Sequence, residues 1–82
     1  MKTAKDIPVE EIDAMYKKIG ANVKRVREKK KMTQLQLSQA LDLKSTGLVS
    51  QSELYINKQH FNIKHLYKIA YILGCDIKEF LK

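Results

Sequence analysis

The stretch that decides the fold is Met32–Leu54, with the sequence MTQLQLSQALDLKSTGLVSQSEL. Thr33 begins a Thr-Gln-Leu-Gln segment. Its hydroxyl can accept from the backbone N–H of Gln36, whose side chain can reach back to the N–H of Thr33. This capping box predicts a short helix that ends near Asp42. A second short helix is expected over residues 45–54, so the stretch predicts two helices joined by a tight turn.

The second of these helices has few apolar positions. Leu48 and Val49 are its apolar anchors, and most of its other residues are polar. One apolar stripe is enough to hold a helix on a domain, so the polar remainder is free to face another molecule. Two short helices joined by a tight turn, the second mostly polar, are typical of a helix-turn-helix. The second helix of that motif enters the major groove of DNA.

An apolar stripe at three- and four-residue spacing predicts a long helix before this pair, from about residue 8 to residue 30. Gly20 lies inside it and costs about 1 kcal/mol relative to alanine, so the helix can break there. The stripe consists of Ile12, Met15, Ile19, Val23 and Val26. We interpret residues 1–8 as a candidate flexible N-terminal extension and residues 9–82 as the folded domain.

Two more helical segments follow the pair. Asn62 is expected to cap the first, and Gly74 suits the left-handed position that ends it. Asp76 begins a last helical turn, with Glu79 as its capping-box partner. The positions expected to face the core are Ile63, Leu66, Ile69, Ala70, Leu73, Ile77, Phe80 and Leu81. The sequence thus predicts an all-α domain of five helices without strands.

Length and composition restrict the class of protein. The 82 residues suffice for one small core, and 44% hydrophobic with 30% charged residues is typical of a soluble globular domain. The apolar runs are too short for a membrane span, and the N-terminus lacks the apolar region of a secretory signal. The single cysteine, Cys75, has no partner for an internal disulfide or a zinc site. We therefore expect a cytoplasmic protein that has no contact with a membrane.

No catalytic constellation is recognisable in the sequence. There is no glycine-rich phosphate loop, no Ser-His-Asp or Cys-His arrangement and no evident pair of carboxylates for acid–base catalysis. His60 and His65 are not spaced for metal ligation with a cysteine or a carboxylate pair. We therefore expect the protein not to be an enzyme and to bind no metal or small-molecule cofactor.

The net charge of +7 is concentrated in one segment. Residues 17–31 hold eight lysines and arginines against one glutamate, whereas residues 1–16 hold two lysines against four carboxylates. A basic cluster attracts polyanions, above all nucleic acid. A solvated, lysine-rich helix end is the alternative interpretation.

Four sequence pieces resemble the phage-repressor and Cro-like family of helix-turn-helix domains, the XRE type. They are residues 19–27 (IGANVKRVR), 32–37 (MTQLQL), 49–53 (VSQSE) and 66–74 (LYKIAYILG). The four occur in the family's order and at nearly its spacing, over about three-quarters of the chain. The resemblance implies a compact five-helix domain similar to that of lambda repressor. It also implies a transcriptional regulator that binds specific double-stranded DNA, with a repressor expected.

The resemblance also implies roles for individual residues. Gln34 corresponds to a glutamine that contacts a DNA phosphate and braces the second short helix. Arg27 and Glu53 occupy the positions of a structural salt bridge. Gln51 is placed to bond adenine as a bidentate pair, and the loop at residues 57–58 to hold the sugar–phosphate backbone. The residues expected to contact DNA are Gln34, Lys44, Ser45, Thr46, Gly47, Ser50, Gln51, Asn57 and Lys58.

The sequence departs from the family pattern near the second short helix. The turn before Val49 is about one residue longer than usual, and Ser52 stands where a large apolar residue is common. Tyr55 replaces a glycine, and the loop after it is about two residues longer. These departures leave open a second interpretation, a protein-interaction module such as the antitoxin of a toxin–antitoxin pair, in which DNA binding is secondary.

Specific DNA binding by one domain of this size usually requires two copies. We therefore expect a homodimer on a near-palindromic operator with half-sites about one helical turn apart. The dimer surface is expected in the last helical turn, on the side of the fourth helix that contains Tyr71 and Ile72, or in the N-terminal extension.

Overall fold

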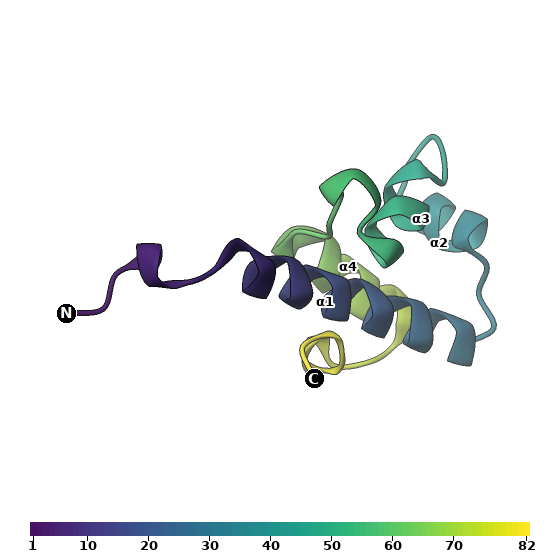
Figure 1. Ribbon diagram of the computed structural model, residues 1–82. Helices are drawn as coiled ribbons and strands as arrows, with labels where there is room; N and C mark the ends of the chain where they lie inside the picture. The colour runs from purple at the N-terminus through teal and green to yellow at the C-terminus, as the bar shows by residue number, and fades with distance from the viewer.

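The computed structural model describes residues 1–82 and contains helices but no strands (Figure 1). Its four α-helices are α1 (Val9–Lys29), α2 (Gln34–Ala40), α3 (Gly47–Leu54) and α4 (Ile63–Leu73). Three 3-10 turns accompany them: η1 (Ala4–Asp6), η2 (Ile56–Lys58) and η3 (Ile77–Phe80). The expected all-α class is therefore confirmed. The expected count of five helices is not, because the last segment forms a single 3-10 turn.

The long helix α1 organises the molecule. α2, α3 and η2 lie on one side of it and η3 on the other, and its first turns extend past the rest of the domain (Figure 1). α3 makes the most extensive contact with α1. The buried core consists of Ile19, Val23, Val26, Leu37, Val49, Phe61, Leu66, Ile69, Ala70, Leu73 and Phe80. Every α-helix thus contributes to one core.

The apolar stripe on α1 is longer than the core beneath it. Ile12 and Met15 share the helix face of the buried Ile19, yet they are 45% and 54% exposed. Both are uncovered because α1 extends beyond the elements that pack against it (Figure 1). The first turns of α1 therefore present an uncovered apolar side.

The ends of α4 also differ from the expected core. Ile63 and Leu81, both expected to be buried, are exposed, and Phe61 is buried instead. The reason at the start of α4 is that the chain turns inward before the helix begins. Phe61 enters the core there, and Asn62 at the cap directs Ile63 outward.

A left-handed residue follows each of the four α-helices, and three of the helices end in the same motif. Lys31 after α1, Asp42 after α2 and Gly74 after α4 have φ values of 56°, 61° and 68°. In each case the next backbone N–H donates to the carbonyl five residues earlier, at 2.9–3.1 Å, as in a Schellman motif. These abrupt ends allow the chain to reverse direction, so that the next element can pack on the helix before it.

Capping boxes begin α2 and α4. The backbone N–H of Gln36 donates to Thr33 Oγ1 at 3.0 Å, and that of Thr33 to Gln36 Oε1 at 2.8 Å, as predicted. At α4, Asn62 and His65 form an equivalent pair at 2.8 and 3.1 Å, in which His65 Nδ1 is the acceptor. This requires an unprotonated Nδ1, and burial, chiefly, lowers the pKa of His65.

The cap of η3 is different from the predicted one. Asp76 Oδ1 accepts from the backbone N–H of Lys78 at 2.9 Å, whereas the side chain of Glu79 pairs with Lys82. Glu79 is therefore not the capping-box partner of Asp76. Its ion pair with Lys82 lowers the pKa of the Glu79 carboxyl.

Gly20 does not break α1 but allows α3 to approach it closely. A Cβ atom at this position would lie 2.3 Å from the carbonyl oxygen of Ser52 and 2.8 Å from that of Glu53. These atoms belong to the backbone of α3, so they cannot move unless the helix moves. The expected break at Gly20 is therefore wrong: the glycine is needed for helix packing, and α1 continues through it.

We predict that Gly20→Ala lowers the free energy of unfolding by about 1–3 kcal/mol, because α1 and α3 must separate to accommodate the methyl group. Gly47→Ala is the matched control, since a Cβ there meets only Ser45 Oγ at 3.6 Å. The control should be neutral or more stable by up to about 1 kcal/mol, because alanine is the better helix former. Urea unfolding measures both, and equal stabilities would contradict the close approach.

Candidate nucleic-acid interface

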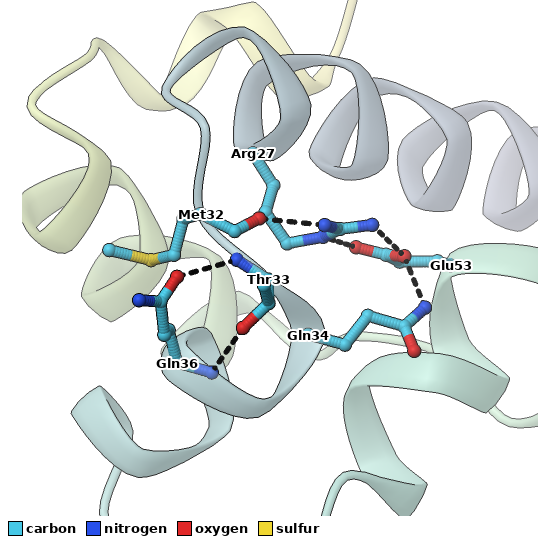
Figure 2. A network of polar contacts seen from close by, with 6 residues as sticks. All are labelled: Arg27, Met32, Thr33, Gln34, Gln36 and Glu53. Atoms are coloured by element: carbon cyan, nitrogen blue, oxygen red, sulfur yellow. Dashed lines mark hydrogen bonds and ion pairs between the residues drawn. The ribbon is translucent and has the colours of Figure 1, made fainter.

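The centre of the candidate site is the buried carboxylate of Glu53 (Figure 2). Arg27 donates to it twice, from Nε at 2.7 Å and from Nη2 at 3.0 Å, which makes a bidentate ion pair. Gln34 Nε2 donates to Glu53 Oε1 at 3.0 Å, and Arg27 Nη1 donates to the carbonyl of Met32 at 2.8 Å. α1, α2 and α3 are therefore joined through one carboxylate, and Arg27 also holds the connection after α1.

Burial makes this network costly to disturb. The side chains of Arg27 and Glu53 are 8% and 0% exposed, and loss of one buried partner typically costs about 3–5 kcal/mol. The hydrogen bond to Glu53 raises the pKa of Arg27, although burial alone would lower it. The charge of Arg27 is thus balanced inside the protein and does not contribute to the basic surface. The pair fixes the C-terminal end of α3 against α1 and α2.

α3 is anchored by one face and presents the other. Val49, Ser52 and Glu53 are buried. The expected recognition helix over residues 45–54 begins two residues later, at Gly47, because the residues before it form the turn. Of the residues predicted to contact DNA, Lys44, Ser45, Asn57 and Lys58 are exposed, and Gln34, Thr46, Gly47, Ser50 and Gln51 are half-buried.

Leu54 belongs to the outward face of α3, although sequence reasoning missed it. It is exposed and lies three residues after Gln51 and seven after Gly47, so the three residues share one helix face. The spacing of non-buried positions along the helix is the signal that could have found it. The outward face thus combines polar side chains with one apolar side chain at its C-terminal end.

An aromatic clamp holds the loop after α3 against α1. The ring of Tyr16, on α1, stacks on His60 with 4.0 Å between ring centroids, and on Tyr55 with 5.7 Å. The hydroxyl of Tyr55 donates to Asp13 at 2.7 Å, which raises the pKa of Tyr55 to about 12. Asp13 also lies 4.0 Å from the ammonium group of Lys58. The loop predicted to contact phosphates is therefore tied to α1.

The same loop has an unusual backbone. Tyr55, Asn57 and Lys58 have φ values of 58°, 54° and 59°. Asparagine tolerates this left-handed region, but for tyrosine and lysine it costs about 1–2 kcal/mol per residue. The stacking and the hydrogen bond of Tyr55 supply contacts that offset this cost. Asp13 and Tyr16 could not be assigned to the loop from the sequence, because no pattern connects them to it.

The basic segment at residues 17–31 does not form one patch. Arg25, Lys29 and Lys30 line a groove of about 300 Å³ next to η3. The η3 segment that borders it lies on the opposite side of α1 from α3 (Figure 1). Lys17 lies three residues before Gly20, and Lys24 lies four residues after it. Both lysines are therefore on the face of α1 that meets α3. Only part of the predicted basic cluster is therefore close to the candidate site.

Comparison of the chain with models of protein families, with curated proteins and with solved structures found no match. The structure contains no group of three or more histidine, cysteine, aspartate or glutamate side chains that could hold a metal ion. None of its helices combines the length and the apolar character needed to cross a membrane.

We predict that Arg27→Met and Glu53→Leu each lower the free energy of unfolding by about 3–5 kcal/mol, because each leaves the other charge buried without its partner. The double variant should lose less than the sum of the two, with a coupling energy of about 1–3 kcal/mol. Chemical unfolding of the four proteins measures this cycle. Additive losses would show that the two side chains do not act as a pair.

Proposed function

We propose that this protein is a sequence-specific double-stranded DNA-binding transcriptional regulator, with α2 and α3 as its helix-turn-helix. The observation that supports this most directly is the placement of α3. One face is buried and fixed by the Glu53 network, and the other presents small polar side chains. A major groove about 12 Å wide admits one such helix. The resemblance to XRE-type domains supports the same function, a fold like that of lambda repressor and the role of a repressor.

In this proposal, α3 enters the major groove with its outward face toward the bases. Gln51 bonds adenine N6 and N7, and Ser50 donates to or accepts from a neighbouring base. Leu54 can contact a thymine methyl group through its exposed side chain. These contacts distinguish sequences, because each base pair presents its own pattern of donors, acceptors and methyl groups in this groove.

Phosphate contacts position α3 in the groove but do not select the sequence. Lys44, in the turn before α3, and the loop at residues 57–58 supply these contacts. Gln34 has a double role, because the amide that braces Glu53 retains a second N–H that can donate to a phosphate. Lys58 exchanges its partner Asp13 for a phosphate when DNA binds.

The small size of the domain supports a homodimer on a near-palindromic operator. A module of this size buries about 600–1,000 Å² on DNA, and two copies supply the affinity and the specificity that one lacks. A cytoplasmic location suits access to DNA, and the proposed function requires neither catalysis nor a cofactor.

A protein-interaction module, such as an antitoxin, is the second candidate. The observation that favours it is the amount of exposed apolar surface outside α3, on the first turns of α1 and on α4. The two candidates differ in one property, since only a regulator must prefer one DNA sequence strongly over random DNA.

The test starts with selection of bound duplexes from a random library, and the best duplex and random DNA are then titrated at two salt concentrations. We predict a preference of about 10³-fold or more for the selected duplex. Gln51→Ala should lose about 1–3 kcal/mol on that duplex and almost nothing on random DNA. Lys58→Ala should weaken binding to both duplexes alike and reduce the salt slope by about one unit per protomer.

Three results would contradict these assignments. Salt-dependent binding without an enriched DNA motif would contradict the regulatory function and favour the protein-interaction module. Equal losses of Gln51→Ala on both duplexes would show that Gln51 does not contact a base. An unchanged salt slope for Lys58→Ala would show that Lys58 does not contact a phosphate.

A further inference from the structure

The N-terminal arm, residues 1–16, has an apolar side that no part of the domain covers. Its exposed large apolar side chains are Met1, Ile7, Val9, Ile12 and Met15. The last two continue the stripe that is buried further along α1, so the arm has the pattern of a helix that packs against a partner. The arm also holds two lysines and four carboxylates, so it is acidic in an otherwise basic chain.

A second uncovered surface lies on α4. Tyr67 and Tyr71, 73% and 86% exposed, form a ridge between two apolar grooves. One groove, of about 410 Å³, lies between α4 and the end of α2; the other, of about 230 Å³, lies between α4 and η3. Lys68 and, from the end of α2, Asp42 line the larger groove, and Lys64 is exposed one helical turn before Lys68. We call this surface the tyrosine face; its charged neighbours on α4 are basic.

The arm cannot cover the tyrosine face of its own chain. α1 continues without a break from Val9 to Lys29, and it holds the arm out beyond the domain (Figure 1). For the arm to fold back, the helix would have to break. The side chains of Asp13 and Tyr16 also tie the end of the arm to the loop after α3.

We propose that the arm of one copy docks on the tyrosine face of a second copy, and that the second arm docks on the first copy in return. The inference deepens the homodimer of the proposed function by naming its interface, but it does not require DNA. Complementary charge supports this partner, because acidic arm residues such as Glu10 and Glu11 would meet Lys64 and Lys68. Tyrosine is also among the residues enriched at protein interfaces.

Symmetry makes this exchange self-limiting. Each copy contains one arm and one face, so a two-fold dimer uses both twice and leaves neither uncovered. A stable interface buries about 800 Å² per partner, and two arm contacts can approach that area where a single one would not. α3 takes no part in either surface, so its outward face stays available to DNA.

The test is the mass of the free protein in sedimentation equilibrium over a concentration series. The unchanged protein should form a dimer, twice the 9.5 kDa of the chain. Met15→Lys places a positive charge on the arm, and Tyr71→Asp places a negative one on the face. Each should weaken dimerisation at least about tenfold, a loss of about 1.4 kcal/mol. Leu35→Asp is the control, because Leu35 is exposed on α2 but lines neither groove, and this variant should remain dimeric.

A mixture of the two variants is the decisive sample. A Met15→Lys copy and a Tyr71→Asp copy together have one unaltered arm contact and one in which the new charges are opposite. The mixture should therefore dimerise more tightly than either variant alone, while circular dichroism shows both to be folded. A single-surface dimer, arm to arm or face to face, predicts no such recovery.

The proposal would be overturned by a protein that stays monomeric over the series, or by a mixture that does not recover. These failures are distinct from failure of the proposed function. A dimer that selects no DNA sequence would support the arm exchange and contradict the proposed regulatory function. A monomer that selects a DNA sequence would contradict the arm exchange and support the proposed regulatory function.

Discussion

The structure depends on one constraint: a carboxylate is buried only where enough donors surround it. Glu53 has three, two from Arg27 and one from Gln34, and these come from the two helices that precede α3. The carboxylate is stable only when α1, α2 and α3 are all in place. The network therefore specifies the relative position of the three helices, which hydrophobic contacts alone would specify less strictly.

The position of α3 has consequences for the rest of the domain. Glu53 draws its C-terminal end toward α1, and Gly20 allows the two backbones to come close enough. The opposite face, with Ser50, Gln51 and Leu54, stays at least partly accessible to another molecule. The loop after α3 must then turn within a few residues, which it does through left-handed residues held by the ring of Tyr16. A fixed helix and a fixed loop are what a protein needs to match the regular spacing of DNA groups.

The sequence was sufficient for the helices and for local signals such as the capping box at Thr33, because these depend on residues close together in the chain. The role of Gly20 was misjudged, since propensity shows the cost of a glycine but not the helix that lies against it. The exposure of Ile12 and Met15 did not follow from the stripe, because a stripe shows which side of a helix is apolar and not how far the domain extends. The clamp around Asp13 left no pattern in the sequence, and the Arg27–Glu53 pairing was expected from a resemblance rather than from spacing.

The proposed regulator contacts DNA with the surface around α3 and not with the groove next to η3, where Arg25, Lys29 and Lys30 lie. The most direct measurement is a titration of the isotope-labelled protein with a duplex, followed by the NMR shifts of its backbone amides. We expect the largest changes at Gln34, across residues 44–51 and at residues 57–58. Changes concentrated instead at Arg25, Lys29 and Lys30 would contradict the account, because they would show that DNA is attracted by charge on the opposite side of α1.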